Sequence, residues 1–335
     1  MKKLAEFLLS AALLSTLAGC SSGNSSQDAS KPEQKSEYTV AVVKQLDHAS
    51  LDEIANAVIA ELDALAAKNN IRIVYEEFSG QNDQTTLKQI GDQVIAEGVD
   101  AIIPIATLAA QTMTVAAEET KTPVIFAAVS DPEGSDLTGF DYVTGTSDAL
   151  NTTQIMDMMF AQNADIKKVG LLYSTSESNS EKPVADAKKY IDGMPEAEYI
   201  EATGNTRDEI ITAASVLIAE GVDAIFTPTD NVVMDAEISI KDALIEAGIP
   251  HYTGADSFVR NGAFTTCGVN YTDLGTKTAD LAYEALTKGI ASMEDFYLMD
   301  GGIITVNTET AEALGADTSM FSKFGEVVEV TTTEE

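Results

Sequence analysis

The sequence predicts an α/β protein built from two doubly wound parallel-sheet lobes joined by a hinge. Three observations lead to this prediction. Short apolar segments alternate with amphipathic segments of helical length along most of the 335 residues. The alternation restarts near the middle of the chain, and one eight-residue sequence occurs unchanged in both halves. A chain of this length is also too long for one compact core and suits two domains of ordinary size.

The first half of the chain begins its alternation with a strand expected at 38–43. A helix is expected over 50–70, where apolar residues recur at helical spacing and Ser50 with Glu53 forms a capping box at the start. The further elements expected in this half are strands at 71–75, 101–105 and 123–129 and helices at 84–97 and 109–119.

The second half of the chain repeats this order. The elements expected there are strands at 169–173, 198–202, 224–227 and 250–253 and helices at 183–191, 207–220 and 233–247. Strands separated by helices of this length pair in parallel, and the helices cover both faces of the sheet.

The repeated sequence links the two halves residue by residue. Ile95-Ala-Glu-Gly-Val-Asp-Ala-Ile102 recurs at 218–225, a shift of 123 residues that also aligns Asn82 with Asn205. In each copy a glycine, Gly98 or Gly221, ends a helix just before a buried strand. The two lobes are therefore expected to have equivalent topology.

The N-terminus has the pattern of a bacterial export signal. A short basic start is followed by an apolar stretch at 7–18, which is too short to span a bilayer. Leu17-Ala18-Gly19-Cys20 resembles the lipobox, in which signal peptidase II cuts before the cysteine and the thiol receives diacylglycerol. We therefore expect a lipoprotein signal peptide at 1–19, a fatty-acyl (palmitate) anchor on Cys20 and a flexible tether at 20–37. An ordinary signal peptide with an incidental cysteine is the alternative.

The charge balance excludes two classes of partner. Lys and Arg number 20 against 54 Asp and Glu, a formal net charge of −34. Such a surface repels nucleic acid, because DNA affinity comes mainly from Lys and Arg that neutralise phosphates. It also repels an anionic membrane, so a membrane contact is expected only through the lipid on Cys20.

The sequence contains two cysteines, Cys20 and Cys267. If Cys20 carries lipid, no internal disulfide can form, and Cys267 is expected to be a small core or cleft-lining residue. An enzyme is not expected. His48 and His251 are the only histidines, no Gly-x-Ser-x-Gly or P-loop sequence is present, and no His/Cys cluster has metal-ligand spacing.

Polar residues follow the strands of both halves. In doubly wound sheets, ligands bind outside the carboxyl ends of the strands. The candidates of the first half are Gln45, Thr107, Ala109, Gln111, Ser130 and Asp131. Those of the second half are Ser178, Asn179, Ser180, Thr229, Asp230, Asn231 and Asp256. Such residues also cap helices, but their recurrence after strand upon strand in both halves favours one shared polar cleft.

The stretches 45–52, 105–111, 123–132, 172–180, 229–231 and 270–275 carry a family resemblance. With them, the sequence from Val40 to Gly289 resembles the ABC-transporter substrate-binding protein family that includes the tryptophan and other aromatic amino-acid receptors (the TrpX-like group). Two residues depart from the family pattern. Ala49 and Leu108 stand where proline is common, and the first departure suggests that His48 is a loop residue and not a ligand contact.

The resemblance implies a type I periplasmic-binding-protein fold and an extracytoplasmic, lipid-anchored receptor. It would capture a small solute, an aromatic amino acid such as tryptophan, and deliver it to the transmembrane subunits of an ABC permease, with no cofactor. A nucleoside or sugar receptor of the same fold and a solute-sensing lipoprotein remain as alternatives.

The resemblance also suggests how an amino acid would be held. Helix N-termini at Thr107 and at 178–180 would meet the ligand carboxylate. Asp230, and next Asp256 or Asp131, would meet the ammonium. The aromatic side chain would need a wall, for which the candidates are Phe126, Tyr173, Phe258 and Tyr271, each of which could equally be a core residue.

The family mechanism implies two lobes that close around the ligand. Lobe 1 is expected at 38–143 plus 273–288 and lobe 2 at 144–260 plus 293–324, with hinge crossings at 261–272 and 289–292 and an acidic tail at 325–335.

Overall fold

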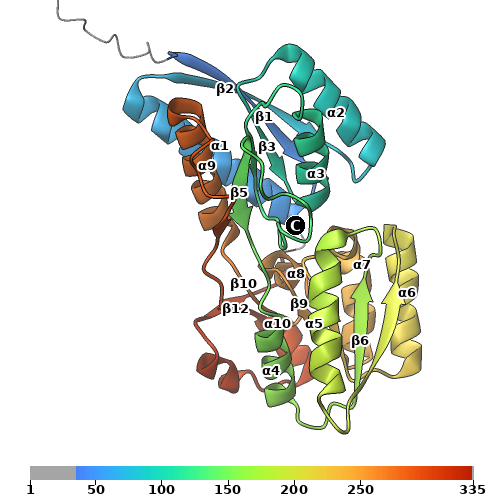
Figure 1. Ribbon diagram of the computed structural model, residues 1–335. Coiled ribbons are helices and arrows are strands. Elements are labelled where there is room, and N and C mark those ends of the chain that lie inside the picture. Colours follow the sequence, from blue (N-terminus) through green and yellow to red (C-terminus); the bar gives the residue numbers. More distant parts are fainter. Residues whose placement is uncertain (1–34, 334–335) are drawn as a thin grey trace, which may run out of the picture. The chain divides into compact units, whose positions relative to one another are not determined.

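A computed structural model describes residues 35–333 of the chain and contains two sheets (Figure 1). The strands of the first are β1 (Glu37–Lys44), β2 (Arg72–Ser79), β3 (Ala101–Ile105), β4 (Val124–Phe126), β5 (Val143–Ser147) and β11 (Tyr297–Leu298). The strands of the second are β6 (Lys168–Tyr173), β7 (Glu198–Thr203), β8 (Ala224–Thr227), β9 (His251–Thr253), β10 (Thr265–Gly268), β12 (Ile303–Asn307) and β13 (Val327–Val330).

The strand order is that of doubly wound sheets. The first sheet runs β11-β5-β4-β3-β1-β2 and the second β13-β12-β10-β9-β8-β6-β7. Neighbouring strands are parallel, except that β10 and β12 are antiparallel. The predicted α/β class with two parallel-dominated sheets is confirmed.

Helices flank both sheets. Those of the first are α1 (Ala49–Asn69), α2 (Gln84–Glu97), α3 (Thr107–Ala116) and α9 (Tyr271–Lys288). Those of the second are α4 (Thr152–Gln162), α5 (Glu181–Asp192), α6 (Arg207–Glu220), α7 (Asn231–Glu246), α8 (Asp256–Arg260) and α10 (Thr308–Leu314), with 3₁₀ turns η1 (Ser178–Ser180) and η2 (Ser319–Lys323). Figure 1 shows α1 beside α9 on one face of the first sheet and α2 beside α3 on the other.

Strand β1 shows why its central residues, 40–43, are all apolar. Successive side chains of a strand point to opposite faces. Val40 and Val42 pack in one buried cluster with α1 and α9, whereas Ala41 and Val43 pack in another with α2 and α3. A strand that is covered on both faces needs apolar residues at every position, which is the signal that predicted it.

The repeated sequence has the same structure in both copies. It spans the end of α2 and the start of β3 in the first half, and the end of α6 and the start of β8 in the second. Gly98 and Gly221 end these helices with φ of 71° and 67°, values that glycine adopts without steric cost. The prediction of equivalent helix ends is confirmed.

The capping box expected at the start of the helix over 50–70 is wrong. The helix is α1, and its N-cap is His48, whose side chain makes no capping hydrogen bond. Ser50 instead forms a hydrogen bond with Ser257 of α8. Glu53 accepts one from Thr272 Oγ1 at 2.7 Å, so both members of the expected box bond to other helices.

Of the connections between the sheets, the one at 269–270 lies within the expected hinge crossing 261–272, whereas 299–302 lies beyond the expected 289–292. Strand β5 continues the first sheet to Ser147, past the expected lobe boundary at 143/144. The chain then passes between the sheets at 148–151, 269–270 and 299–302. The acidic tail expected at 325–335 is wrong for Val327–Val330, because these residues form β13 and pair with β12.

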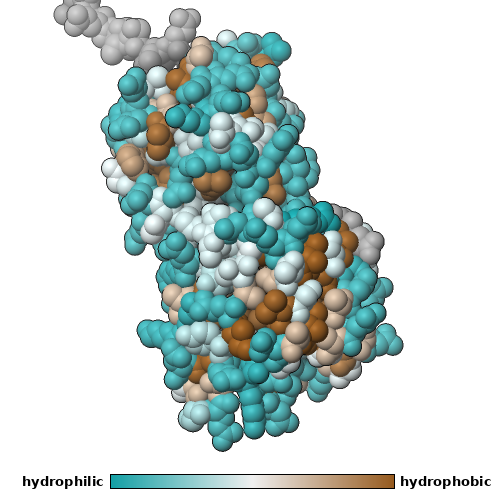
Figure 2. Space-filling model, turned by 90° about the vertical axis from the view of Figure 1, so that its right-hand side faces the viewer, coloured by the Kyte–Doolittle hydropathy of each residue, from teal (hydrophilic) through white to brown (hydrophobic). Residues whose placement is uncertain are grey.

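The expected signal peptide, the lipidated Cys20 and nearly all of the tether lie outside the described residues. Within residues 35–333, none of the helices combines the length and the hydropathy needed to cross a bilayer. Cys267 is a free, buried thiol, as predicted for a core residue. Figure 2 shows a mostly hydrophilic surface on the side that carries α2 and α6, with hydrophobic residues gathered on its lower half. Val216 of α6 and Ile238 of α7 are among the exposed large hydrophobic residues.

Candidate functional site

Side chains from both lobes meet around one small space. It is bounded by the loops that follow several strands and by the first turns of α1, α7, α8 and α9. The lining residues are His48, Ser50, Leu51, Ala128, Ser130, Asp148, Thr229, Asp230, Asn231, Met234, Ala255, Phe258 and Tyr271. We call this space the interlobe site. Its free volume is about 20 Å³, which is room for roughly one water molecule.

On the side of the first sheet, the interlobe site is built around Asp148, which directly follows β5. Ser130 Oγ donates a hydrogen bond to Asp148 Oδ1 at 2.9 Å, and the Tyr271 hydroxyl donates to Asp148 Oδ2 at 3.2 Å. Two other segments, the loop after β4 and the start of α9, therefore converge on the carboxylate that follows β5. Burial raises the pKa of Asp148, and the two hydroxyl donors partly oppose that shift.

On the side of the second sheet, Asp230 is the N-cap of α7. Its Oδ1 accepts hydrogen bonds from the backbone N–H groups of Val232 and Val233 at 3.1 and 3.0 Å. Its Oδ2 accepts from the Ser174 N–H and the Ser180 hydroxyl, both at 2.7 Å. A carboxylate has about four acceptor positions, so this group is fully used by its own lobe.

Among residues 35–333, four side-chain hydrogen bonds connect the two lobes directly. Three of these pairs are Ser130 Oγ with Thr229 Oγ1 at 2.9 Å, His48 Nε2 with Asn231 Oδ1 at 3.1 Å, and Ser50 with Ser257. The fourth is the 2.6 Å hydrogen bond that Gln45 Nε2 donates to Glu177 Oε1. These bonds hold the lobes together at the interlobe site.

Glu177 uses both carboxylate oxygens in hydrogen bonds at the contact between the lobes. Its second oxygen, Oε2, accepts a hydrogen bond from Asn231 Nδ2 at 2.8 Å. Burial, and next the nearby Asp230 carboxylate, raise the pKa of Glu177 to about 7. Gln45 is held for this contact by Asn82 Oδ1 and by the Leu108 N–H, at 2.9 and 3.1 Å.

His48 contributes a buried acceptor. Its Nε2 faces the amide oxygen of Asn231, so Nε2 carries the proton and Nδ1 is the unprotonated nitrogen. Burial lowers the pKa of His48, which keeps the ring neutral. Within residues 35–333, Nδ1 is buried without a hydrogen-bond partner. His48 was expected to be an ordinary loop residue, but it lines the interlobe site.

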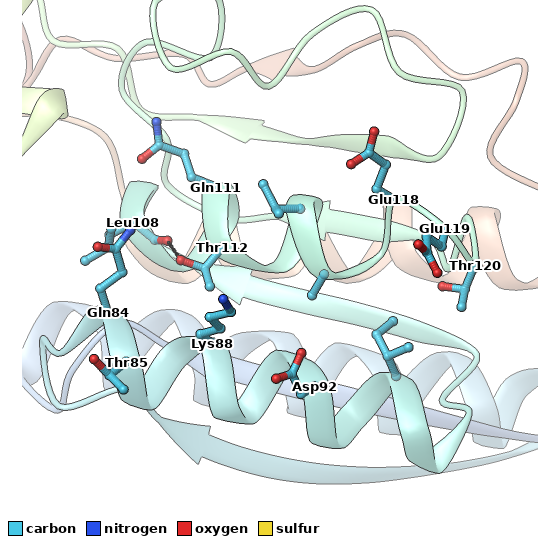
Figure 3. Close-up of a pocket in the computed structure, with 13 residues that line it drawn as sticks. Gln84, Thr85, Lys88, Asp92, Leu108, Gln111, Thr112, Glu118, Glu119 and Thr120 are labelled. Atoms are coloured by element: carbon cyan, nitrogen blue, oxygen red, sulfur yellow. Dashed lines mark hydrogen bonds between the residues drawn. The ribbon is translucent and has the colours of Figure 1, made fainter.

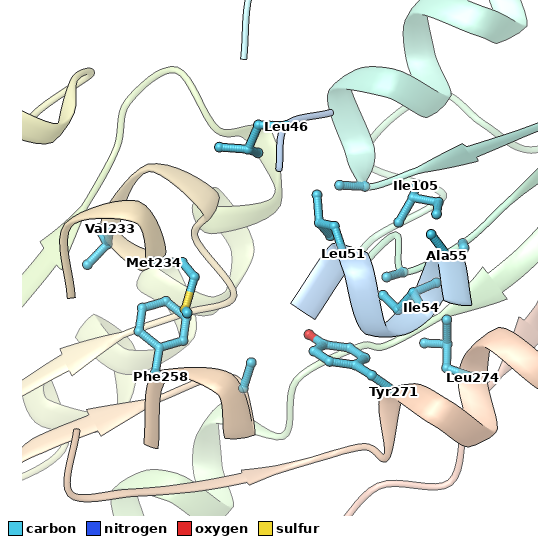
Figure 4. Packing of buried hydrophobic residues seen from close by; sticks show 14 of the residues in the cluster. Leu46, Leu51, Ile54, Ala55, Ile105, Val233, Met234, Phe258, Tyr271 and Leu274 are labelled. Carbon is cyan, nitrogen blue, oxygen red and sulfur yellow. The ribbon is translucent and has the colours of Figure 1, made fainter. Parts of the chain in front are cut away.

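The remaining wall of the interlobe site is apolar. Figure 4 shows Leu51 of α1 above the ring of Tyr271, and Met234 of α7 beside Phe258 of α8. All four residues belong to one buried cluster that includes side chains of both lobes. Of the four aromatic residues proposed as a wall, Phe258 and Tyr271 line the site. Phe126 is in the core behind the first sheet, and the Tyr173 hydroxyl donates to Glu201 at 2.6 Å instead.

The predicted binding residues fall into three groups. Ser130, Thr229, Asp230, Asn231 and Tyr271 line the interlobe site. Gln45, Asn179 and Ser180 support it through hydrogen bonds to its lining or to Glu177. The structure does not bring Thr107, Ala109, Gln111, Asp131, Ser178 and Asp256 into the lining.

The residues outside the lining have other partners. Ala109 is in the core of the first lobe, and Gln111 Nε2 donates to the Ser135 carbonyl at 3.1 Å. Asp131 accepts from the Gly134 N–H within a turn, and Asp256 forms an ion pair with Arg260 at 3.1 Å. Thr107, buried, and Ser178 are the first residues of α3 and η1.

Sequence reasoning missed Asp148 and Glu177. The rule that ligands bind after strand ends points to Asp148, but strand β5 was not recognised because its sequence, Val-Thr-Gly-Thr-Ser, has no apolar run. Glu177 lies within a recognised polar loop, between its serines. Its burial could be found only once the opposite lobe was in place.

A larger groove lies away from the interlobe site. It runs between α2 and α3 on the outside of the first lobe and measures about 1100 Å³ (Figure 3). Its labelled polar side chains are Gln84, Thr85, Lys88, Asp92, Gln111, Thr112, Glu118, Glu119 and Thr120. All of its lining residues belong to the first lobe, so it is separate from the interlobe site.

Comparisons with known proteins agree with this arrangement. Residues 39–320 match the family described as ABC transporter substrate binding protein. The chain is 28% identical over 322 residues to a tyrosine-binding protein of Clostridioides difficile, covering 93% of this chain and 92% of that protein.

Two solved structures are similar at nearly equal identity. One is an ABC domain from Streptococcus pneumonia in complex with L-Trp, at 27% identity and a TM-score of 0.79, covering 88% of this chain and 100% of that one. The other is the ligand-free, open structure of a substrate binding protein with adhesive properties from Clostridium difficile, at 26% identity and a TM-score of 0.64 over the same shares. The expected type I periplasmic-binding-protein fold is confirmed, and the chain belongs to the family of ABC transporter substrate binding proteins.

Proposed function

We propose that this protein is an extracytoplasmic lipoprotein that captures an aromatic amino acid between its lobes and delivers it to the permease of an ABC importer. The observation that carries the proposal is the composition of the interlobe site. Buried carboxylates and hydroxyls lie there against an apolar wall that includes Leu51, Phe258 and Tyr271. A zwitterion with a ring needs both kinds of surface.

The free volume of the interlobe site bears on how binding would occur. Pockets for organic ligands usually measure about 300–1000 Å³, far above the 20 Å³ between the lobes. The lobes therefore have to separate before a ligand enters. The higher TM-score with the tryptophan complex than with the open structure supports the view that this arrangement is the closed one.

The connections at 148–151, 269–270 and 299–302 are where such a hinge would bend. The ligand would stabilise the closed form by contacting both lobes, which is a shift between two populated states. The closed form would then dock on the permease. A lipid on Cys20 would hold the receptor at the membrane and raise its effective concentration beside that partner.

The ligand assignment rests on the relatives named for tyrosine and tryptophan. Its test is thermal unfolding and calorimetry of the purified protein with the aromatic amino acids, with other amino acids, and with nucleosides and sugars. We expect binding of an aromatic amino acid together with a smaller radius of gyration in X-ray scattering. Stabilisation by a sugar or a nucleoside alone would overturn the ligand assignment and leave the fold untouched.

The lipid anchor needs a separate test. Expression with a radioactive or clickable palmitate should label the protein and place it in the membrane fraction. The variant Cys20→Ala should lose both the label and the membrane association. An unlabelled wild type would show that residues 17–20 act as an ordinary export signal.

A further inference from the structure

The interlobe site contains acidic side chains but no positively charged ones among the described residues. Its lining contains two carboxylates, Asp148 and Asp230, and neither Lys nor Arg among the residues that the structure describes. Buried charges in proteins are normally paired, because an isolated ion loses its hydration on burial. A ligand that carries a positive group would supply the missing partner.

The two carboxylates differ in what they can still accept. Asp230 receives four hydrogen bonds from its own lobe, three of them from backbone N–H groups. Its role is to cap α7 and tie the loops of the second lobe together. Asp148 receives one side-chain hydroxyl on each oxygen, from Ser130 and Tyr271, which leaves room for a further donor.

Asp148 also has no cationic partner within residues 35–333. The influences on its ionisation are burial and hydrogen bonds, with no contribution from a Lys or Arg. By contrast, Asp256 forms an ion pair through Oδ2 with Arg260 at 3.1 Å, although its Oδ1 is buried without a hydrogen-bond partner within residues 35–333. Asp131 accepts the Gly134 N–H within a turn at 3.0 Å. Neither of these two acids, which were considered next after Asp230 for this role, lines the interlobe site.

From these contacts we infer that Asp148 holds the ammonium group of the ligand, and that Ser130 and Tyr271 are the positioning residues that orient its carboxylate. This inference rests on the proposed amino-acid function and replaces Asp230, the residue first expected in this role. His48 is also in the lining, and its unprotonated Nδ1, which has no hydrogen-bond partner within residues 35–333, is a second candidate acceptor. An ammonium has three donors, so it can use more than one acceptor.

The geometry explains why one acid would serve both recognition and closure. Ser130, which donates to Asp148, lies 2.9 Å from Thr229 of the other lobe. A cation that fixes Asp148 therefore also fixes the side chain that touches the second lobe. Deleting the charge should weaken binding of any ligand with an ammonium and spare ligands without one.

The experiment compares amino acids with analogues that lack one charged group. The probes are L-tyrosine, 3-(4-hydroxyphenyl)propionate, which lacks the ammonium, and tyramine, which lacks the carboxylate, together with the equivalent indole compounds. Calorimetry on wild type should show that losing the ammonium weakens binding by about 10- to 100-fold, the range for hydrogen bonds to charged groups. An analogue without ammonium that binds within about threefold of the amino acid, well below that range, would overturn the inference.

Asp148→Asn is the decisive variant because it removes the charge and keeps the size. We expect the affinity for L-tyrosine to fall by about 10- to 100-fold, while the affinity for the analogue without ammonium changes by less than about threefold. The matched control is Asp141→Asn, an exposed acid just before β5, which should change neither. A folded Asp148→Asn protein that loses both ligands equally, or neither, would contradict the assignment.

Misfolding of the variant and failure of the proposed function can each be distinguished from failure of the Asp148 assignment. If Asp148→Asn fails to fold, judged by its thermal unfolding, the wild-type comparison of the three probes decides the inference alone. If wild type binds no aromatic amino acid, the proposed function fails first. The role of Asp148 is then tested with whichever amino acid does bind and its own analogue without ammonium, and a wild type that binds only uncharged solutes would overturn it.

Discussion

The amide nitrogen of Gln45 lies 2.6 Å from Oε1 of Glu177, and this hydrogen bond joins the loop after β1 to the loop after β6 across the two lobes. Both side chains are buried. If the lobes separate as proposed, this bond would break, and the protonation of Glu177 would then be linked to the movement of the lobes.

Exchanging Gln45 for Glu should destabilise the closed form. The new carboxylate keeps an acceptor for the Leu108 N–H but faces Glu177, and two acids at this distance cannot both be ionised. We expect ligand affinity to fall by at least about tenfold at pH 8, and by less at pH 5, where a shared proton relieves the repulsion. Calorimetry at both pH values measures this.

The control for that exchange is Gln93→Glu. Gln93 faces Glu97 on the exposed surface of α2 at 2.9 Å, so the same change of charge is screened by solvent and should leave affinity unaltered. Equal losses in the two variants would show that the Gln45–Glu177 contact has no special part in closure.

Glu177→Gln should change how stability depends on pH. Burial raises the pKa of Glu177 from 4.5 to about 7, so the folded protein keeps a proton that the unfolded chain releases. The stabilisation of the folded state by this shift is therefore complete below pH 4.5 and is lost as the pH rises through 7. Between pH 5 and pH 8, the free energy of unfolding of the variant should rise relative to that of wild type by up to about 3 kcal/mol.

Urea unfolding of both proteins at several pH values tests this expectation, with Glu97→Gln, an exposed acid at the end of α2, as the matched change. Parallel profiles for wild type and Glu177→Gln would mean that Glu177 titrates in the folded protein as it does in the unfolded chain.

Gly145→Ala should be strongly destabilising. A methyl group at Gly145 in β5 would lie 2.2 Å from the Phe126 carbonyl oxygen and 2.4 Å from its ring. Neither the backbone of β4 nor a buried ring can move away cheaply, so we expect a loss of about 2 kcal/mol or more in the free energy of unfolding. Gly301→Ala, where a methyl would meet its nearest atom at 3.7 Å, should cost little. Denaturant unfolding of the two variants makes the comparison.

Cys267 should be inert in the folded protein. The residue is 2% exposed, and burial raises the pKa of its thiol to about 11. Because the thiolate is the reactive form, a Cys20→Ser protein at pH 8 should resist a thiol reagent until denaturant is added. Labelling measured by mass spectrometry would contradict this if it reached completion under native conditions as fast as in urea.

The sequence alone determined the elements that carry strong local signals. The repeated sequence placed the ends of α2 and α6 and the starts of β3 and β8, because a helix, a left-handed glycine and a doubly buried strand each impose their own residue types. The rule about strand ends also pointed to Ser130, Thr229, Asp230 and Asn231, which the structure places in the lining of the interlobe site.

The repeat also shows how far a local signal extends. Asn82 and Asn205, aligned by the repeat, both hold the loop after the first strand of their lobe. Asn82 accepts from Gln45, whereas Asn205 accepts from Ser174, Thr175 and Ser176. The alignment predicted equivalent positions, but the partners differ because the loops after β1 and β6 have different sequences.

Only the tertiary structure decided which acids matter. Asp131, Asp148, Asp230 and Asp256 each follow a strand or begin a helix, and nothing in the sequence separates them. In the folded protein Asp131 accepts a backbone N–H within a turn, Asp256 pairs with Arg260, and Asp230 accepts four hydrogen bonds from its own lobe. Asp148 is buried and accepts hydrogen bonds from two hydroxyl groups. A carboxylate is tuned by burial and by the donors around it, and both come from segments far apart in the chain.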